Sequence, residues 1–315
     1  MEPPATVGKD SRRAAPLYGA LYPFAPHHLA VDGGRIHYVD EGPRDAPVLL
    51  MLHGNPTWSF YFRELIRGFS TDHRVVAIDH LGCGLSDKPE GYDYRLEARI
   101  AHVERLVDAL SLRDLTLVVH DWGGAIGMGY AVRHPDRARR FVVFNTAAFP
   151  SERIPFSIDI CRWPIFGPLM IRGLNAFSKV ALIRAVHHRE RLTPEVRSGY
   201  LAPYDAWATR VAQLRFVQDI PMRKDHPSFA LLAQIGAGLA QLRGRPMLLA
   251  WGAHDFCFDL EYLAEWRARF PEAEVEVYED AGHYVVEDAH ERIIPRMRRF
   301  LEAHPLDGRA VEAAS

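Results

Sequence analysis

The feature that most constrains the fold of this chain is a regular alternation of short apolar runs with longer segments of helical period. Residues 95–110 repeat apolar side chains at helical spacing, and residues 124–135 form a segment of small residues that ends at Pro135. Seven runs have the character of strands, at 35–42, 47–52, 74–79, 115–120, 140–145, 246–251 and 274–279. From residue 47 onward these runs are almost continuously apolar, as expected of parallel strands that are buried on both faces. The alternation predicts an α/β fold with a doubly wound, mostly parallel sheet.

The alternation lapses between residues 150 and 225. This interval is rich in Pro and aromatic residues, two of its segments have helical period, and it shows no strand pattern. We therefore expect a core made of residues 25–149 and 226–303, with a helical cap of residues 150–225 inserted into it. Residues 1–24 and 304–315 are expected to be loose tails, because their Pro, Ala and charged residues offer little apolar surface to bury.

Charge and cysteine usage narrow the class of protein. The 315 residues have a formal net charge of −2, and Lys and Arg are scattered along the chain, so no nucleic-acid partner is expected. The apolar runs are too short for a transmembrane segment, and the first residues lack the apolar centre of a signal peptide. Cys83, Cys161 and Cys257 lie far apart without metal-ligand spacing, which indicates reduced thiols. We expect a cytoplasmic protein, and no metal or organic cofactor is implied.

Residues 118–124, VVHDWGG, place Asp121 between a predicted strand and a predicted helix. A strand, a sharp turn and a helix form the nucleophile elbow of a hydrolase, which holds a reactive side chain at the carboxyl end of the sheet. Two residues before the nucleophile such elbows carry a small residue, whereas this chain has Val119. An aspartate at the end of a strand also often caps the following helix. Asp121 is therefore either a nucleophile or a helix cap.

Three further segments follow predicted strands and favour the nucleophile. The turn HGNP (53–56) would supply a backbone N–H of Asn55, beside that of Trp122, to an oxyanion hole. Asp255 follows the penultimate strand, and His283 follows the last one. Nucleophile, acid and histidine in this order are typical of the α/β-hydrolase fold.

These blocks together resemble the haloalkane dehalogenase family of α/β-hydrolases over residues 25–303. The matching segments are HGNPTW (53–58), DHLGCGLSDKP (79–89), VVHDWGGAIG (118–127), WGAHDF (251–256) and DAGHYVVED (280–288). The resemblance implies an eight-stranded sheet and an aspartate nucleophile, Asp121, which attacks a saturated carbon and forms an alkyl ester. Water can then attack the carbonyl of that ester, whereas a serine alkylated at such a carbon would be a dead-end ether.

The resemblance also assigns the remaining site residues. It implies that His283 is the base and that Asp255 orients it and stabilises the imidazolium. One branch of the family carries its acid where this chain has the neutral Asn145, so this duty falls to Asp255; Asp259 and Asp280 are nearby rivals. The side-chain amide of Asn55 and the indole N–H of Trp122 match the family's pair of halide donors.

The cap narrows the resemblance. Residues 161–178 and 196–221 are similar to the cis-β-lactone decarboxylases of bacterial long-chain olefin biosynthesis. This resemblance implies a dialkyl 2-oxetanone as substrate and a cis-olefin and CO₂ as products. It also implies possible assembly with other enzymes of that pathway. The site would hold this small apolar substrate in a tunnel, for which the candidate lining residues of the cap are Trp163, Phe166, Phe177, Tyr204, Trp207 and Phe216. The alternative is that most of these side chains only pack the cap on the core. The alternative is a haloalkane dehalogenase. An epoxide hydrolase, which would use Tyr200 and Tyr204 as acids, and a non-catalytic ligand-binding protein of this fold are less favoured.

Overall fold

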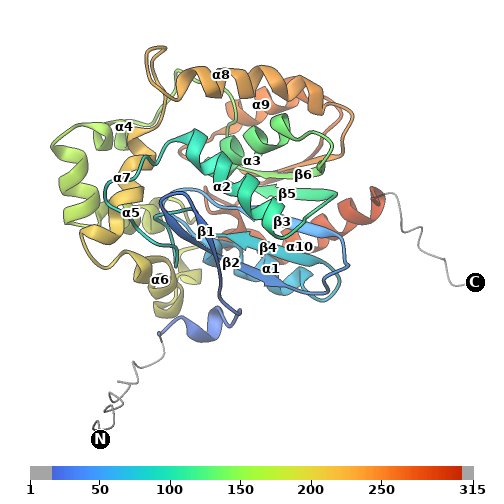
Figure 1. The fold of residues 1–315 in the computed structure, drawn as a ribbon, viewed down its shortest axis with the longest axis horizontal. Helices are drawn as coiled ribbons and strands as arrows, with labels where there is room; N and C mark the ends of the chain where they lie inside the picture. The colour runs from blue at the N-terminus through green and yellow to red at the C-terminus, as the bar shows by residue number, and fades with distance from the viewer. Residues whose placement is uncertain (1–15, 307–315) are drawn as a thin grey trace, which may run out of the picture.

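A computed structural model describes residues 16–306, and it has an eight-stranded sheet between two layers of helices (Figure 1). The strands are β1 (His27–Val31), β2 (Gly34–Glu41), β3 (Val48–Leu52), β4 (Arg74–Ile78), β5 (Leu115–Val119), β6 (Ala138–Phe144), β7 (Met247–Gly252) and β8 (Glu274–Tyr278). Their order across the sheet is β1-β2-β4-β3-β5-β6-β7-β8. β1 and β2 pair antiparallel, as do β2 and β4, and all other neighbours pair parallel. The predicted doubly wound, mostly parallel sheet is confirmed.

The helices of the core cover both faces of this sheet. The α-helices are α1 (Arg63–Phe69), α2 (Leu96–Ala109), α3 (Trp122–Arg133), α8 (Phe229–Gly238), α9 (Leu260–Arg269) and α10 (Val285–Ala303). Strand β3 shows how the sheet divides the interior: Leu50 and Leu52 pack into the cluster under α2, α3, α8 and α9, whereas Leu49 and Met51 pack into the cluster under α1 and α10. Alternate side chains of a strand point to opposite faces, so a continuously apolar strand serves both cores.

Strand β1 was not among the seven runs picked out in the sequence. Its segment, HHLAV, alternates between partly buried and exposed side chains and contains two histidines, so it lacks the apolar signal of the inner strands. It pairs with β2 across the tight turn at Gly33 and Gly34, both of which have positive φ. Edge strands depend less on burial, and their weak apolar pattern is the reason that this strand escapes a search for apolar runs.

The segment between β6 and α8 forms the cap, which lies at the left of Figure 1. It contains α4 (Phe156–Asp159), α5 (Ala176–Arg184), α6 (Pro194–Leu201) and α7 (Val211–Gln218). Short helical turns connect them: η3 (Ile160–Arg162), the π-helix η4 (Pro168–Gly173), η5 (Arg189–Arg191), η6 (Ala202–Tyr204) and η7 (Ala208–Arg210). Two more such turns, η2 (Ser59–Phe62) and η8 (Leu239–Leu242), belong to the core. The cap has helices and connecting loops without a strand, which agrees with the missing strand pattern.

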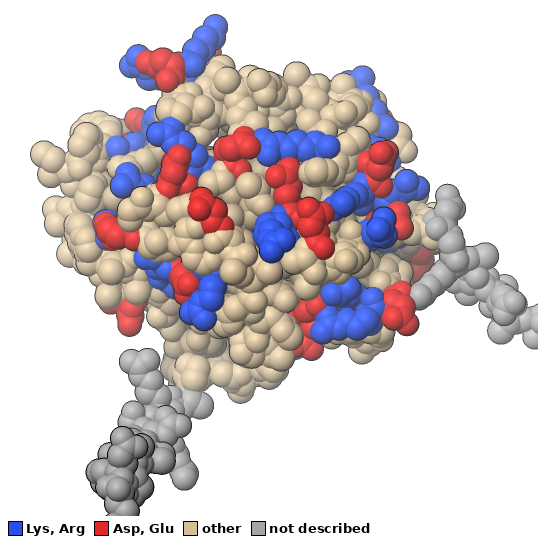
Figure 2. Space-filling model, in the orientation of Figure 1, with Lys and Arg blue, Asp and Glu red and all other residues tan. Residues whose placement is uncertain are grey.

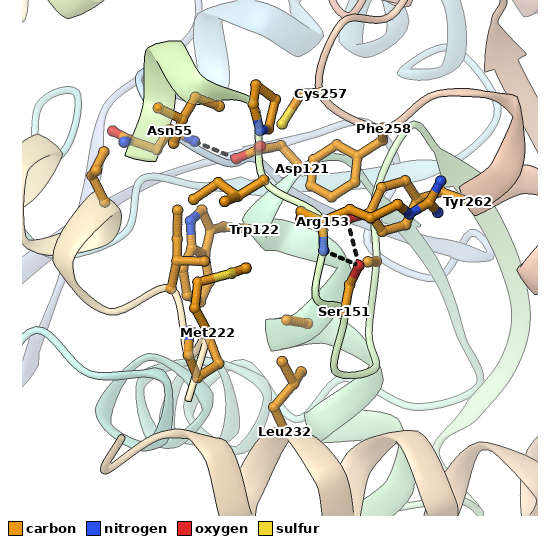
Figure 3. A pocket seen from close by; sticks show the side chains of 18 of the residues that line it. Asn55, Asp121, Trp122, Ser151, Arg153, Met222, Leu232, Cys257, Phe258 and Tyr262 are labelled. Carbon is orange, nitrogen blue, oxygen red and sulfur yellow. Dashed lines mark hydrogen bonds between the residues drawn. The ribbon is translucent and has the colours of Figure 1, made fainter. Parts of the chain in front are cut away.

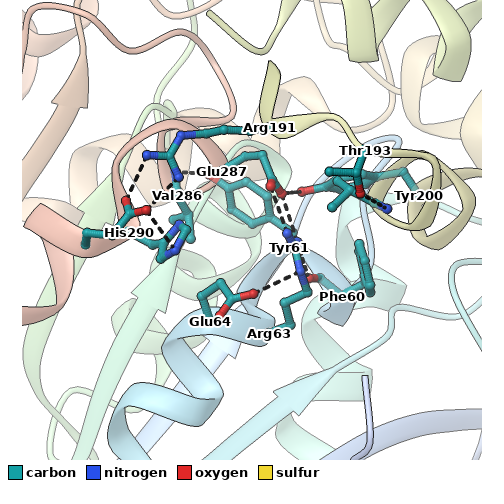
Figure 4. A network of polar contacts seen from close by, with 12 residues as sticks. Phe60, Tyr61, Arg63, Glu64, Arg191, Thr193, Tyr200, Val286, Glu287 and His290 are labelled. Carbon is teal, nitrogen blue, oxygen red and sulfur yellow. Dashed lines mark hydrogen bonds and ion pairs between the residues drawn. The ribbon is translucent and has the colours of Figure 1, made fainter. Parts of the chain in front are cut away.

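A buried polar network joins the cap to the core (Figure 4). The guanidinium of Arg63 in α1 donates two hydrogen bonds of 2.8 Å to the carboxylate of Glu287 in α10. The hydroxyl of Tyr200, in the cap helix α6, donates a third to Glu287 at 2.8 Å. All three side chains are buried. Removing one partner of such a pair leaves a buried charge and costs about 3–5 kcal/mol, so the network ties the cap firmly to α10.

The described part of the expected N-terminal tail packs on the protein. The turn η1 (Gly19–Leu21) holds the buried Tyr18 and Tyr22 against Trp58, with ring centroids 5.8 and 4.9 Å apart. The expectation of a loose segment was therefore wrong for residues 16–24, because two aromatic side chains find an aromatic cluster to cover. The remainder of both predicted tails, 1–15 and 307–315, lies outside the described residues. Between residues 16 and 306, no helix has the length and apolarity needed to cross a bilayer.

Candidate active site

Asp121 lies at the sharp turn between β5 and α3 with φ 52° and ψ −128°, a backbone conformation that non-glycine residues rarely adopt. The turn requires close approach: a Cβ at Gly123 would lie 1.9 Å from the carbonyl oxygen of Leu52. Although Asp121 precedes α3, its side chain makes none of the usual capping hydrogen bonds, because the N–H groups of Gly123 and Gly124 donate to the backbone carbonyls of His120 and Asp121. The helix-cap alternative is therefore excluded, and the strained turn presents the carboxylate at the carboxyl end of the sheet.

Val119, the bulky residue that departed from the usual elbow, is accommodated by the helix that follows. A Cβ at Gly127 in α3 would lie 2.7 Å from a methyl group of Val119 and 3.0 Å from one of Leu52. Gly127 thus leaves the space that Val119 fills. The space that a small residue usually provides in the strand is here provided by Gly127 in the facing helix.

The two oxygens of the Asp121 carboxylate have different surroundings. Oδ1 accepts a hydrogen bond of 2.7 Å from the backbone N–H of Asn55, and the backbone N–H of Trp122 also bonds to the carboxylate. Oδ2 lies 3.6 Å from Nε2 of His283. Burial raises the pKa of Asp121 above its ordinary value, although His283 and the two N–H groups oppose the rise. Oδ1 is thus held by the N–H of Asn55, and Oδ2 faces the imidazole.

His283 is held by Asp255, as the sequence predicted. Nδ1 of the imidazole lies 2.7 Å from Oδ2 of Asp255, and both side chains are buried. Burial alone would lower the pKa of His283, but the carboxylates of Asp255 and Asp121 outweigh it and raise that pKa. The backbone N–H of Cys257 donates to the other oxygen of Asp255 at 2.6 Å. Asp255, His283 and Asp121 therefore form a continuous line of polar contacts.

The two rival acids have other partners. Asp259 caps α9 by accepting hydrogen bonds from the backbone N–H groups of Glu261 and Tyr262. Asp280 pairs with Arg292 at 2.6 Å and with His188 at 3.2 Å. Neither contacts His283, so of the three candidate acids the structure brings only Asp255 to Nδ1 of the imidazole.

Asn145, at the place where one dehalogenase branch carries its acid, holds the turn that bears Asp255. Its side-chain oxygen accepts a hydrogen bond of 2.8 Å from the N–H of Gly252, and its amide donates to the carbonyl oxygens of Gly252 and Phe258. A neutral amide can both donate and accept here, which a carboxylate cannot do.

Asn55 and Trp122 both border the space above Asp121. The amide of Asn55 donates one hydrogen bond of 3.2 Å to the carbonyl oxygen of Gln213 in α7, which leaves its second N–H for a ligand. The indole of Trp122 packs against Phe216 with ring centroids 5.4 Å apart. No residue between 16 and 306 accepts a hydrogen bond from the indole N–H of Trp122. The predicted pair of anion donors thus lies beside the carboxylate.

Two apolar cavities meet at Asp121. We call them the first arm, about 840 Å³, and the second arm, about 900 Å³, volumes that include space open to solvent. Asn55, Asp121 and three apolar residues (Ile158, Phe177 and Cys257) border both arms. The first arm runs from Asp121 past Met222 to Leu232 of α8 (Figure 3). The second arm runs between α5 and the η3–η4 segment of the cap. Their size and apolar lining suit a small apolar ligand with two branches.

Only two of the six cap residues expected to line the tunnel do so: Phe177 borders both arms and Phe166 borders the second. The expectation was wrong for the other four. Trp163 and Trp207 are 53% and 50% exposed and face outward. Phe216 is buried against Trp122 and under the guanidinium of Arg99, 3.2 Å from its ring centroid. The aromatic character of a cap residue therefore does not tell whether its side chain lines the cavity or packs elsewhere in the protein.

Tyr204 is the fourth of these residues, and its hydroxyl is engaged away from both arms. It donates to the carbonyl oxygen of Thr57 at 3.1 Å and accepts from the N–H of Gly84 at 3.2 Å. The hydroxyl of Tyr200 is bound to Glu287. Neither tyrosine borders the cavities that meet at Asp121.

Several lining residues were missed in the sequence. Cys257 and Phe258 lie two and three residues after Asp255, and the ring of Phe258 stacks on His283 with centroids 5.8 Å apart. Their adjacency to a predicted catalytic acid is a signal that could have identified them. Ile158, Met222 and Leu232 come from segments without any local signal, and only the fold brings them to the site.

Comparison with known proteins agrees with this geometry. A family model described as the alpha/beta hydrolase fold matches residues 47–161 and 182–289. The chain is 44% identical to a cis-3-alkyl-4-alkyloxetan-2-one decarboxylase from Shewanella oneidensis, over 90% of this chain and 91% of that protein. It is 42% identical to a protein of the same name from Xanthomonas campestris, over 90% and 98%.

Among solved structures, a haloalkane dehalogenase from Bradyrhizobium elkani matches with a TM-score of 0.81 and 27% identity, covering 89% of this chain and 98% of that one. The decarboxylases are therefore nearer in sequence than this dehalogenase. The chain belongs to the α/β-hydrolase family, within the group that includes these decarboxylases and the haloalkane dehalogenases.

Proposed function

We propose that this chain is a β-lactone decarboxylase, which converts a cis-3,4-dialkyl-2-oxetanone to a cis-olefin and CO₂. The observation that carries the proposal is the pair of apolar arms that meet at Asp121. A 2-oxetanone with alkyl groups on two neighbouring carbons needs a space for each chain, with the ring at the junction. Relatives named as decarboxylases of such oxetanones, at 42–44% identity, support the same substrate class.

We place the bond-forming step at Asp121. Because Oδ1 accepts the hydrogen bond from the backbone N–H of Asn55 and Oδ2 faces His283, we assign to Oδ2 the attack on the ring carbon bearing the lactone oxygen. The new C–O bond forms an alkyl ester while the ring C–O bond breaks, and its electron pair makes a carboxylate on the neighbouring carbon. The free N–H of Asn55 and the indole N–H of Trp122 would stabilise this anion. Attack at the carbonyl carbon would instead leave an alkoxide, and water would release a hydroxy acid.

The ester can then collapse without water. As CO₂ leaves, the electron pair of the C–C bond forms the double bond, and the ester C–O bond breaks to restore the carboxylate of Asp121. Inversion in the first step, followed by departure of the two groups from opposite sides, keeps the cis arrangement. In this route the imidazole of His283, whose pKa is raised, stabilises the carboxylate of Asp121 as it leaves the ester. Asp255 keeps the imidazole aligned.

The proposal is tested with two substrates in parallel. The purified protein is given a synthetic cis-dialkyl β-lactone or a 1-haloalkane of similar length, and olefin, CO₂ and halide are measured. We expect olefin and CO₂ from the lactone as the faster reaction. Brisk halide release with an untouched lactone would show that the proposal is wrong.

Haloalkane hydrolysis is the second candidate, and the donor pair of Asn55 and Trp122 beside an aspartate nucleophile favours it. That reaction needs His283 as a base for water, so His283→Ala should trap an alkyl ester on Asp121. Mass spectrometry of the intact variant and of its peptides detects the added alkyl group. An unmodified protein, or a group carried by Cys257, would exclude this second candidate.

The remaining alternatives receive less support. An epoxide hydrolase of this group would direct two cap tyrosines at the substrate, whereas the hydroxyls of Tyr200 and Tyr204 are bound to Glu287 and Thr57. A non-catalytic ligand-binding protein would have no use for the strained turn at Asp121 or for the aligned His283 and Asp255.

A further inference from the structure

The cap carries most of the exposed large apolar side chains of the protein. Eleven such residues are exposed between residues 16 and 306, and eight of them come from the cap. Six of the eight are half exposed or more, and we call them the cap surface: Phe156, Trp163, Ile165, Leu169, Leu174 and Trp207. Ile165 is 85% exposed and Phe156 is 73% exposed. The left edge of Figure 2, over α4 and α5, is correspondingly poor in charged residues. A cluster of this kind indicates an interaction site, whereas scattered exposed apolar residues do not.

Contacts within the cap show that Leu169 and Trp207 of this surface are neighbours. A Cβ at Gly173 would lie 3.5 Å from a methyl group of Leu169 and 3.8 Å from the indole of Trp207. The guanidinium of Arg172 lies over the ring of Trp207, 4.6 Å from its centroid. The ammonium group of Lys179 donates to the carbonyl oxygen of Leu174 at 3.2 Å. The exposed cation Lys179 therefore lies beside Leu174 of this surface.

The cap segment is cationic in an otherwise anionic protein. Residues 156–197 contain seven Lys or Arg and three Asp or Glu, a formal charge of +4, whereas the whole chain carries −2 and the remainder therefore −6. Lys179 and Arg184 form no ion pair with a carboxylate of the described residues. Such an asymmetry favours an anionic partner at the cap.

The second arm of the active-site cavity reaches the same side of the molecule. Val180 and Arg184, both exposed residues of α5, border this arm together with Phe166 and Met170. An apolar compound that leaves a lipid phase at the cap surface would meet this arm before any other part of the site.

We propose that the cap surface docks on an anionic lipid bilayer. The bilayer supplies both an apolar interior for Trp163, Ile165 and Leu169 and negative headgroups for Lys179 and Arg184. A protein partner would have to supply a face that is at once apolar, acidic and complementary in shape. The docking is peripheral, since none of the helices within residues 16–306 could span a bilayer. The surface stands apart from the proposed reaction; only the benefit of drawing a dialkyl substrate from the membrane rests on that reaction.

Vesicle sedimentation tests the proposal without any turnover. The full chain is mixed with vesicles of phosphatidylcholine alone or of phosphatidylcholine with phosphatidylglycerol, and the bound fraction is measured. We expect binding to the anionic vesicles that weakens with added salt. The double variant Ile165→Ser/Leu169→Ser removes two exposed side chains and should bind about tenfold more weakly or worse. Lys179→Gln/Arg184→Gln should lower binding by about fivefold for each charge removed.

Matched variants on the core keep the test specific. Leu17→Ser/Leu260→Ser also replaces two exposed leucines, and Arg299→Glu changes an exposed charge of α10, yet neither should alter binding. Thermal melts confirm that all variants fold. Failure to bind either vesicle overturns the proposal, as does equal binding by the cap and control variants. If the protein binds no vesicles but self-associates, and Ile165→Ser/Leu169→Ser abolishes this self-association, a second copy covers the surface instead of a bilayer.

Discussion

Asp121 combines a strained backbone, a buried carboxylate and a fixed orientation. Oδ1 accepts a hydrogen bond of 2.7 Å from the N–H of Asn55, and the N–H of Trp122 also bonds to the carboxylate, so these donors fix the side chain before any substrate arrives. These donors oppose the cost of burying the charge, as does the imidazole of His283, whose Nε2 lies 3.6 Å from Oδ2 and lowers the pKa of Asp121. A side chain held in this way has one oxygen free to react, and this is the chemical basis of the proposed function.

Replacing Asp255 by Asn should separate the three candidate acids. The amide cannot raise the pKa of His283 or stabilise its cationic form, so kcat for the lactone should fall by about 10²- to 10⁴-fold. Asp259→Asn and Asp280→Asn remove acids that do not touch His283, and both should keep the wild-type rate. Steady-state kinetics on the three variants measure this. Equal losses in all three would show that Asp255 has no special role.

The pKa of Asp121 predicts the acid side of the pH profile. Only the carboxylate can attack, and burial raises its pKa above the ordinary 3.8, so kcat/KM should fall as the pH decreases through this raised value. The measurement is kcat/KM at each pH. Circular dichroism at the same pH values checks that any loss of activity is not caused by unfolding. Activity that stays constant down to a pH of about 3.8 would mean that Asp121 keeps an ordinary pKa or does not react.

The sequence identified the polar residues of the site better than the apolar ones. Asp121, Asp255, His283, Asn55 and Trp122 each follow a predicted strand, and the carboxyl ends of parallel strands meet at one edge of the sheet. The cap aromatics carry no such positional information. Whether Trp163 faces outward or Phe177 faces Asp121 depends on how the cap helices pack, which no local pattern records.

At the scale of single elements, α3 is adapted to β5. Gly127 leaves the volume that Val119 occupies, so the two positions form one packing unit across the strand and the helix. This unit lies directly below the turn that strains Asp121. Its packing therefore helps to hold the backbone of the proposed nucleophile in its unusual conformation.

Gly127→Ala should destabilise the protein by about 1–3 kcal/mol, because its Cβ would lie 2.7 Å from a methyl group of Val119. Adding Val119→Ala should restore part of this loss, so that the two substitutions are not additive. Gly173→Ala, whose Cβ would meet ordinary van der Waals distances, is the control and should be neutral. Denaturant unfolding of the single and double variants gives the coupling. Strict additivity would show that the two residues do not share this space.

Element prediction succeeded where burial produced a strong pattern. The seven apolar runs correspond to β2 through β8 within two residues at each end, and the helical stripe of 95–110 corresponds to α2 at Leu96–Ala109. The prediction missed β1, because an edge strand needs no continuous apolar run. The cap was recognised only as helical, since its short α, 3₁₀ and π turns follow from packing against the core rather than from a long amphipathic stripe.

At the scale of the whole molecule, the cap creates the cavity that the core alone lacks. Ile158 and Phe177 of the cap, with Cys257 and Asp121 of the core, form the junction of the two arms. The buried Arg63–Glu287–Tyr200 network fixes the cap to α10, which begins two residues after His283. Cap position and site geometry are thus linked by the fold.

Shortening the first arm should change the preference for chain length. Leu232→Phe adds volume at the end of this arm farthest from Asp121 (Figure 3), so kcat/KM should drop for lactones with long chains and stay unchanged for short ones. Leu231→Phe, on the same helix but outside the lining, should leave the preference as it is. A chain-length series on both variants provides the measurement. A uniform loss for all lengths would mean that no alkyl chain reaches α8.

One measurement tests the central claim most directly: gas chromatography of the products formed from a cis-dialkyl β-lactone by the wild-type protein and by Asp121→Asn. The substitution keeps the shape of the side chain and removes its nucleophilic oxygen. The proposed chemistry predicts cis-olefin from the wild type and only background olefin from the variant, with Asp259→Asn as active as the wild type. Olefin at the wild-type rate from Asp121→Asn, or a hydroxy acid as the wild-type product, would contradict it.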